Sequence, residues 1–381
     1  MIPLSIPNIN GNESKYVLDC LSSGWISSAG AYVNKFEEAI QNYTGAKYAI
    51  ACMNGTAGLE VSLNLAGVSS NDIVIAPNLT FVATLNAISY SGAEIILMDI
   101  CEDSWQIDVN LLKKWLKNNT ITKEVDGIHI TTEISSGKKI GAIMPVYALG
   151  GFIDIDKLVK ICSIYGIPLI EDSTEALGSF KNGKHAGTYG LTGVLSFNGN
   201  KIISTGGGGM ILTNDKDVAN RAKHITTTAK TDPLDYFHDE VGYNYRLVNV
   251  LAAIGVAQME NFESILKRKK EIDALYRTEL NGIGDIKFQT NDPDSDPNCW
   301  LFTFRTKNMR ELLNHLNNSN VQSRPFWTPM NNLPMYKDLM YVNESDISNK
   351  IFKECISIPS SSNLTIDDQY KVISEIKKFY K

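Results

Sequence analysis

Lys201 and Asp172 each follow a short apolar run of the kind found in buried strands. Lys201 ends the run Gly-Val-Leu-Ser-Phe-Asn-Gly-Asn-Lys (193–201), and Asp172 ends Ile-Pro-Leu-Ile-Glu-Asp (167–172). Side chains at the carboxyl ends of two such strands can converge on one cleft of an α/β sheet. A lysine that forms an imine and an acid that keeps a pyridinium nitrogen protonated are what pyridoxal 5'-phosphate (PLP) chemistry requires. Taken singly, Lys201 could be a solvated surface lysine and Asp172 a helix cap.

A second segment offers a phosphate site. Asn-Gly-Thr-Ala-Gly (54–58) follows a strand-like run and opens a predicted helix. Backbone amides at a helix N-terminus bind phosphate, and the small residues Gly55, Thr56 and Ala57 would let it approach. The same pattern also suits a plain helix cap. Phe81, at the start of the next predicted helix, could stack on a planar ring or pack in the core.

Four consecutive glycines, 206–209, follow Lys201 closely. They lack the Lys-Ser/Thr pair of a nucleotide-binding P-loop and lead into a strand, not a helix. We therefore expect a tight hairpin turn at this place.

Composition limits the class of protein. The chain has 381 residues, of which 43% are hydrophobic and 20% charged, with a net charge of −6. The acidic balance argues against nucleic-acid binding, and no apolar run is long enough to cross a membrane. The N-terminus lacks the charged and apolar blocks of a signal peptide. Six scattered cysteines without a Cys-x-x-Cys pair, and histidines without ligand spacing, favour reduced thiols in a cytoplasmic protein and no metal site.

Strand-like and helix-like stretches alternate through the first two-thirds of the chain. This order predicts an α/β fold with a mainly parallel, helix-covered sheet. We expect a large domain over 1–250 and a smaller C-terminal α+β domain over 251–381, entered through one long amphipathic helix from about 247 to 279. The polar stretch 119–139 is expected to form a surface hairpin. The predicted strands are 47–52, 73–76, 95–98, 140–146, 167–171, 193–197 and 209–213; the predicted helices include 31–43, 55–67, 80–91, 108–118, 153–164 and 216–227.

Five motifs in this order resemble a known family. They are Asn-Gly-Thr-Ala (54–57), Leu-Thr-Phe-Val-Ala-Thr (79–84), Ile-Glu-Asp-Ser-Thr-Glu-Ala-Leu-Gly-Ser (170–179), Ser-Phe-Asn-Gly-Asn-Lys (196–201) and Gly-Tyr-Asn-Tyr-Arg-Leu (242–247). The whole chain looks like the sugar-nucleotide aminotransferases of the DegT/DnrJ/EryC1/StrS family, which have the PLP-dependent transferase fold of type I. The motifs span some 200 residues, and both ends of the chain also fit.

The resemblance implies that PLP is the cofactor, that L-glutamate donates the amino group and that a nucleotide-linked keto sugar accepts it. It implies that Lys201 holds PLP and moves the proton, and that Asp172 keeps the ring nitrogen charged. Thr56, Ala57 and Ser196 should hold the phosphate. The implied cofactor contacts are Gly55, Thr56, Ala57, Phe81, Asp172, Glu175, Ser196, Asn200, Lys201 and, from the neighbouring subunit, Asn244.

A contact from the neighbouring subunit implies a homodimer with shared active sites. Asn244 and Arg246 lie in the same polar and aromatic cluster, Gly-Tyr-Asn-Tyr-Arg, which could also form a local turn within one subunit. Arg246 is expected to contact the substrate. Arg324 and Trp327 are the further substrate candidates, since a guanidinium suits a diphosphate and an indole can stack on a ring. The alternative for these two is a surface arginine and a packing tryptophan.

The chain departs from the family pattern at several positions. Glu175 replaces a common amide near the ring hydroxyl, and Ser173, small enough to lie under the ring, replaces an alanine. Gly207 stands where a glutamate is common, and Tyr147 where histidine is frequent. None of these removes a required role. Related sugar dehydratases carry histidine at the position of Lys201, so dehydration is disfavoured.

The motifs Phe-Asn-Gly-Asn-Lys-Ile (197–202) and Arg-Pro-Phe-Trp-Thr-Pro-Met (324–330) look most like the branch that aminates C4 of UDP-linked 4-keto-6-deoxy-N-acetylhexosamines for bacterial surface glycans. Amination of a GDP- or dTDP-linked ketosugar, or amination at C3, is the alternative within the family. A non-catalytic PLP-binding regulatory protein is the alternative from another class, but no DNA-binding segment or basic patch supports it.

Overall fold

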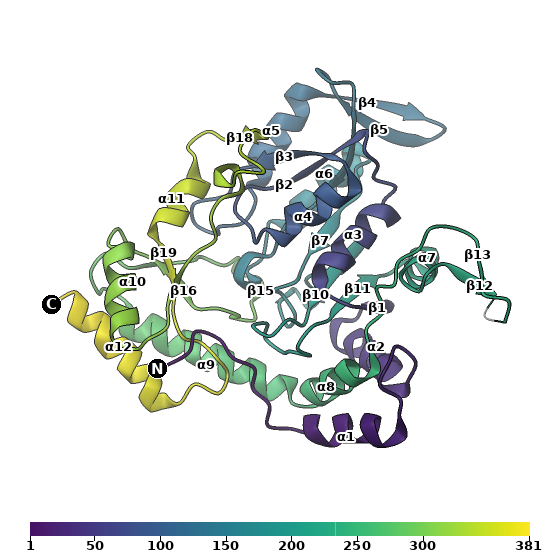
Figure 1. The fold of residues 1–381 in the computed structure, drawn as a ribbon. Coiled ribbons are helices and arrows are strands. Elements are labelled where there is room, and N and C mark those ends of the chain that lie inside the picture. Colours follow the sequence, from purple (N-terminus) through teal and green to yellow (C-terminus); the bar gives the residue numbers. More distant parts are fainter. Residues whose placement is uncertain (233) are drawn as a thin grey trace.

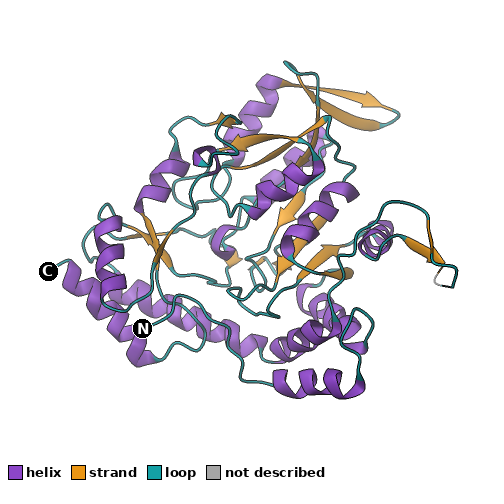
Figure 2. Cartoon of the chain, in the orientation of Figure 1, coloured by secondary structure: helices purple, strands orange, loops and turns teal. Residues whose placement is uncertain are grey.

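The computed structural model describes residues 1–232 and 234–381, and its centre is a twisted sheet enclosed by helices (Figures 1 and 2). Two groups of strands, in the orders β1-β11-β10-β7 and β6-β2-β3-β18, adjoin through the bridges Ile143↔Leu169 and Val146↔Asp172. The pairings are parallel except those of β11, which is antiparallel to β1 and β10. The strands are β1 (Tyr48–Cys52), β2 (Asp72–Pro77), β3 (Glu94–Met98), β6 (Lys139–Ile143), β7 (Ile170–Asp172), β10 (Thr192–Ser196), β11 (Gly209–Thr213) and β18 (Met340–Val342).

Both faces of this sheet are covered, which explains why its strands are apolar throughout instead of alternating. On β2, Ile73 and Ile75 pack in the core that includes the residues of α5 and α6, while Val74 and Ala76 pack with those of α3 and α4. The fold class predicted from the alternation of strands and helices is therefore confirmed. The helices around the sheet are α1 (Glu13–Ser23), α2 (Ala31–Thr44), α3 (Gly55–Leu65), α4 (Ala83–Ser91), α5 (Val109–Asn119), α6 (Ile155–Tyr165), α7 (Lys216–Thr226) and the short η1 (Ala148–Gly150).

The polar stretch 119–139 forms the predicted hairpin, made of β4 (Thr120–Val125) and β5 (Ile128–Glu133), which projects from the sheet (Figure 1). A second hairpin, β12 (Lys230–Asp232) and β13 (Phe237–His238), projects beyond α7. Three short strands, β8 (Phe180–Lys181), β9 (Lys184–His185) and β15 (Ser295–Asp296), pair beside the main sheet.

The C-terminal part contains an antiparallel sheet in the order β14-β16-β19-β17, and the core there includes Phe304, Leu312, Ile356 and Ile373. Its elements are α9 (Phe262–Leu280), β14 (Lys287–Phe288), β16 (Thr303–Arg305), α10 (Met309–Asn318), β17 (Arg324–Pro325), η2 (Met330–Asn332), α11 (Ile347–Glu354), β19 (Cys355–Ser357) and α12 (Ile366–Phe379).

Two segments cross the domain boundary that the sequence predicts at 250/251. Ile2, from the start of the chain, bridges Val321 and packs in the C-terminal core. β18, from the C-terminal third, extends the central sheet beside β3. The division into domains 1–250 and 251–381 stays a prediction. Ile2 and β18 each pack with the part of the chain on the other side of this boundary.

The long helix expected over 247–279 is two helices in the structure, α8 (Asn249–Glu260) and α9, separated at Asn261. α8 packs on α1 and α2, and the start of α9 packs in the same core through Phe262 and Leu266, whereas the rest of α9 reaches the C-terminal core. A Cβ on Gly255 would lie 2.7 Å from the ring of Phe36, so this glycine allows the close approach of α8 to α2. None of the described helices is long and apolar enough to cross a membrane.

His185 gives the fold a predictable pH dependence. It is fully buried against the rings of Phe180 and Tyr43, and its Nε2 accepts the amide hydrogen of Gly178 at 3.0 Å. Burial lowers the pKa of His185 from 6.5 to about 4. As the pH falls from 6.5 toward 4, His185 therefore becomes protonated in the unfolded chain but stays neutral in the folded one. The free energy of unfolding falls by up to about 3 kcal/mol.

We predict that His185→Gln, which keeps an acceptor but cannot be protonated, loses less stability over this pH range than the wild type. Denaturant unfolding at a series of pH values measures the effect. His129→Gln, at an exposed position, is the control and should keep the wild-type dependence. An unchanged dependence in His185→Gln would assign the acid sensitivity to other groups.

Candidate active site

A cavity of about 560 Å³ opens where the carboxyl ends of β7 and β10 face the C-terminal part of the chain. Ten of the residues predicted for the site line it: Gly55, Thr56, Phe81, Asp172, Glu175, Ser196, Asn200, Lys201, Arg324 and Trp327. Residues that sequence reasoning did not select also line it, among them Leu149, Thr84, Thr174 and Trp300. The cavity thus collects residues separated by up to 353 positions, from Leu4 to Ser357.

Lys201 lies on the loop that joins β10 to β11. These strands are antiparallel neighbours, but the tight hairpin turn predicted for the four glycines is wrong. The connection is the loop 197–208, closed at its base by hydrogen bonds from the Phe197 amide to the Gly208 carbonyl (2.9 Å) and from the Thr205 amide to the Phe197 carbonyl (3.0 Å). The glycines therefore end a wide loop that presents Lys201 to the cavity.

The Lys201 ammonium group has two neighbours. Its Nζ lies 3.5 Å from Oε1 of Glu175 and 4.4 Å from the centre of the Trp300 ring. The Lys201 side chain is 10% exposed and that of Glu175 is 2% exposed. The amine is therefore held between a carboxylate and an aromatic face and is not a solvated surface lysine.

Asp172 ends β7, which is the parallel neighbour of β10. Its Oδ2 accepts the hydroxyl of Thr84 at 2.7 Å, and its Oδ1 accepts the hydroxyl and the amide of Thr174 at 2.7 and 3.2 Å. Asp172 is only 3% exposed, so these threonines fix the orientation of its carboxylate. A carboxylate has about four acceptor positions, which leaves capacity for one more donor from the cavity.

The first turn of α3 forms another wall. The side chain of Asn54 caps the helix by accepting the Ala57 amide at 2.8 Å, and Ala57 does not line the cavity. The first amides of a helix have no acceptor within the helix, so those of Gly55 and Thr56 remain for a ligand. A Cβ on Gly55 would lie 3.0 Å from Cγ2 of Thr174 and 3.1 Å from Cβ of Ser196, so only glycine brings this turn so close to Ser196.

These groups fit PLP by the chemistry of their donors. Backbone amides and the hydroxyls of Thr56 and Ser196 suit a phosphate. A fixed carboxylate suits a protonated ring nitrogen, and an enclosed lysine amine suits a covalent bond to an aldehyde. Of the three residues of the α3 turn that the sequence offered for the phosphate, Gly55 and Thr56 line the cavity. Ala57 does not, and its amide already donates to Asn54.

Glu175 is held by an unusual backbone conformation. Its Oε2 accepts the amide hydrogen of Leu149 at 2.9 Å, and Leu149 has φ 59° and ψ 19°, a left-handed conformation that costs a non-glycine residue energy. Burial raises the pKa of Glu175 to about 7, although the positive charge of Lys201 opposes the shift.

Aromatic side chains form the wall contributed by the C-terminal part. The rings of Phe326 and Trp327 stack at 4.5 Å, and that of Phe81 meets Trp327 edge-on at 6.3 Å. Phe81 is 52% exposed, so it is not the core aromatic that its sequence position also allowed. Trp300 donates from Nε1 to the carbonyl of Asn200 at 2.7 Å and so joins this wall to the lysine loop.

Three predicted residues lie outside the cavity lining: Ala57, Asn244 and Arg246. Asn244 is exposed, and its backbone bridges Thr227. Arg246 donates from Nη2 to the carbonyl of Thr227 at 2.9 Å. Arg324 is exposed at the cavity, where its Nη1 donates to the carbonyl of Ser323.

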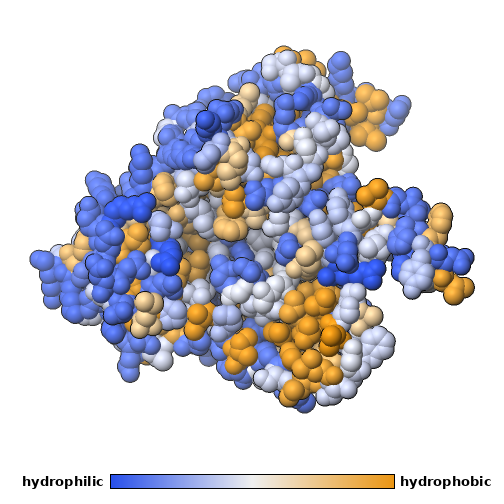
Figure 3. All heavy atoms as spheres, in the orientation of Figure 1, coloured by the Kyte–Doolittle hydropathy of each residue, from blue (hydrophilic) through white to orange (hydrophobic). Residues whose placement is uncertain are grey.

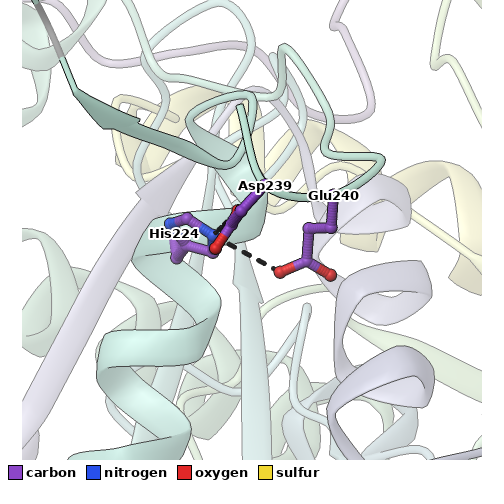
Figure 4. Close-up of side chains that lie close together, drawn as sticks. All are labelled: His224, Asp239 and Glu240. Atoms are coloured by element: carbon purple, nitrogen blue, oxygen red, sulfur yellow. Dashed lines mark hydrogen bonds and ion pairs between the residues drawn. The ribbon is translucent and has the colours of Figure 1, made fainter. Parts of the chain in front are cut away.

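One cluster of possible metal ligands occurs among the described residues, and none of its members lines the cavity. His224, on α7, pairs through Nε2 with Asp239 at 2.8 Å and faces Glu240 at 3.3 Å (Figure 4). Arg221 donates to the Glu240 carboxylate from both terminal nitrogens of its guanidinium group, Nη1 and Nη2. Ion pairs between these side chains account for the cluster.

Comparisons with known proteins agree with this geometry. The model of the DegT/DnrJ/EryC1/StrS aminotransferase family matches residues 7–377. The chain is 34% identical over 382 residues to GDP-perosamine synthase of Escherichia coli O157:H7, covering 100% of this chain and 98% of that protein. It is 27% identical over 394 residues to the UDP-4-amino-4,6-dideoxy-N-acetyl-beta-L-altrosamine transaminase of Campylobacter jejuni, covering 100% of both. The aminotransferase TlmJ from Streptoalloteichus hindustanus has the same fold, with a TM-score of 0.89 at 23% identity over 99% of this chain and 98% of that chain.

Proposed function

Because the chain belongs to the DegT/DnrJ/EryC1/StrS aminotransferase family, we propose that it transfers an amino group from L-glutamate to C4 of a nucleotide-linked 4-keto-6-deoxy sugar. The family consists of PLP-dependent sugar aminotransferases, and this chain is one of them. The observation that carries the proposal is the meeting of Lys201, Asp172 and the first turn of α3 in one cavity.

When bound, PLP supplies an electron sink that stabilises negative charge at the reacting carbon. The residues of the chain hold and use it in separate ways. Lys201 would form the covalent attachment and, once its amine is free, would hold on Nζ the proton that moves during the reaction. Asp172 keeps a proton on the ring nitrogen from the position that Thr84 and Thr174 fix. The amides of Gly55 and Thr56, with the Ser196 hydroxyl, bind the phosphate.

The C-terminal wall is the proposed sugar-nucleotide side of the site. Arg324 is exposed at the cavity, where a diphosphate would find a cation without the cost of burying it. Trp327 and Phe81 offer aromatic faces for a sugar or base. Closing this wall over the cavity would exclude water from the proton transfer at Lys201.

A UDP-linked N-acetylated sugar is the first proposal for the substrate, supported by the motifs 197–202 and 324–330. A GDP-linked sugar is the second, supported by the higher identity to a protein named GDP-perosamine synthase, 34%, than to the UDP-sugar transaminase, 27%. Both assignments are aminations of a nucleotide-linked sugar and differ in the nucleotide.

The purified protein should convert one class of ketosugar in the presence of glutamate. We would incubate it with UDP-, GDP- and dTDP-linked 4-keto-6-deoxy sugars and identify the products by mass spectrometry and NMR. An amino group at C4 of the UDP sugar alone supports the first proposal, and turnover of only the GDP sugar supports the second. Amination at C3, or no amination of any of the three, would contradict the proposed reaction.

We predict that Lys201 carries the cofactor. Borohydride reduction of the PLP-loaded protein should attach the cofactor irreversibly to the peptide that contains Lys201, as detected by mass spectrometry. Lys201→Ala should lose at least the ~10²–10⁴-fold that acid–base catalysis contributes, because both the attachment and the proton carrier disappear. Lys184→Ala, at an exposed lysine outside the cavity lining, is the control and should stay active. Attachment to another lysine would overturn the assignment.

We propose that the protein acts as a homodimer in which Asn244 of the partner subunit reaches the cofactor phosphate. Asn244 is exposed and lies outside its own cavity. Leu18, Leu21 and Trp25, on α1 and just after it, are each about 60% exposed, and Figure 3 shows apolar side chains gathered at that end of the molecule. Apolar surface of this kind is typical of an interface.

Mixed dimers test the shared site. Lys201→Ala and Asn244→Ala chains should each be inactive, but hybrids of the two contain one complete site and should recover activity after joint refolding. A mixture of Lys201→Ala and Asp172→Asn chains is the control and should not recover activity. Lys201 and Asp172 belong to the same chain's site, so each site in such a hybrid lacks one of them. A monomer by light scattering, or no recovery in the hybrids, would contradict the proposal.

The predicted cytoplasmic location remains a proposal. All six cysteines lie among the described residues and none is paired, which is what a reducing compartment would produce.

A further inference from the structure

Glu175 offers Lys201 a proton-transfer partner. Oε1 of Glu175 lies 3.5 Å from Nζ of Lys201, and both side chains are at most 10% exposed. Both groups line the cavity and are otherwise enclosed by protein, so the carboxyl group is placed to exchange a proton with the amine. The carboxyl group of Glu175 is the titratable group that contacts this amine in the described structure.

The carboxyl group is held so that one oxygen faces the amine. Oε2 is fixed by the amide of Leu149, which has a left-handed backbone conformation. The backbone carbonyl of Glu175 accepts Nδ2 of Asn298 at 2.7 Å, which fixes its main chain. Rotation of the carboxyl group away from Lys201 would therefore break the bond to Leu149.

The surroundings of Glu175 allow both protonation states near neutral pH. Burial is the largest effect and raises the pKa of Glu175 to about 7. Two charged groups face it: Lys201, from the loop after β10, lowers the pKa, and Asp172, at the end of β7, raises it. Leu149, from η1, and Asn298, from the segment before Trp300, contribute neutral hydrogen bonds. An acid–base group is most effective when its pKa lies near the working pH.

We propose that Glu175 is a second proton-transfer residue, which exchanges a proton with the amine of Lys201. When the amine leaves a covalent bond, the O–H bond of the Glu175 carboxyl group breaks and an N–H bond forms on Nζ. When Lys201 must act as a base, the N–H bond breaks, its electron pair stays on nitrogen and the proton returns to Oε1. The exchange needs no other reactant and leaves the charge of the pair unchanged. The inference rests on the proposed reactive role of Lys201.

Glutamine is the matched substitution at this position. It keeps the size and the acceptor for Leu149, but it carries no transferable proton. Glu133→Gln is the control. Burial favours a raised pKa for Glu133, yet hydrogen bonds from Ser136 and Ser135 outweigh it and lower the pKa to about 2, so this buried carboxylate does not titrate near pH 7. Glu133 lies outside the cavity lining.

The test measures how fast the cofactor-free full chain attaches PLP, because attachment to an amine requires proton transfers at Nζ. Stopped-flow absorbance after mixing with PLP gives the rate of attachment at each pH. In the wild type and in Glu133→Gln, a plot of this rate against pH should have an inflection near pH 7. In Glu175→Gln we expect the rate to fall by about 10²-fold and the inflection to disappear. Infrared spectra should show a protonated carboxyl band that titrates near pH 7 in the wild type and is missing from Glu175→Gln.

Wild-type rates in Glu175→Gln, or a slower rate that keeps the inflection, would overturn the inference, as would an infrared band that survives the substitution. A failure of the proposed function is a separate result. If no ketosugar is aminated but the inflection depends on Glu175, the substrate proposal fails and the proton exchange stands. If mass spectrometry finds PLP on another lysine, the role of Lys201 fails and the inference with it.

Discussion

The burial of three charged groups in one cavity is the constraint on which the rest of this structure depends. Charged groups away from water are costly unless each has a partner. Lys201 has the Glu175 carboxylate and the Trp300 ring, Asp172 has two threonine hydroxyls, and Glu175 has the Leu149 amide. The partners come from α4, from η1, from the segment after β7 and from the segment before β16, so these segments must be held in defined positions, and Leu149 in η1 has a left-handed backbone.

The C-terminal part of the chain is positioned by the same kind of interaction. Lys269, on α9, is fully buried and donates to the backbone carbonyls of Trp300 and Ser360. Burial lowers the pKa of Lys269 to about 8. This buried amine thus joins α9 to the segment that places Trp300 over Lys201.

The strand and helix pattern could be predicted because buried parallel strands are apolar on both faces and the covering helices carry a single apolar face. Ile73 and Val74, adjacent on β2, pack on opposite sides of the sheet, and a continuous apolar run is the only sequence that satisfies both. The break at Asn261 could not be predicted, since apolar residues continue through it from Met259 to Phe262. The width of the loop 197–208 could not be predicted either, because glycines permit a tight turn as readily as a wide loop.

The sequence by itself was enough to predict the groups that could carry the chemistry: a lysine and an aspartate after two strands, and small residues at the start of a helix. It could do so because each of these depends on local order along the chain. Tertiary structure alone decided that Trp300 lies over the lysine, that Leu149 holds Glu175, and that Asn244 lies outside the cavity of its own chain. These are contacts between surfaces, most of them distant in sequence, and no spacing of residues along the chain encodes which of them meet.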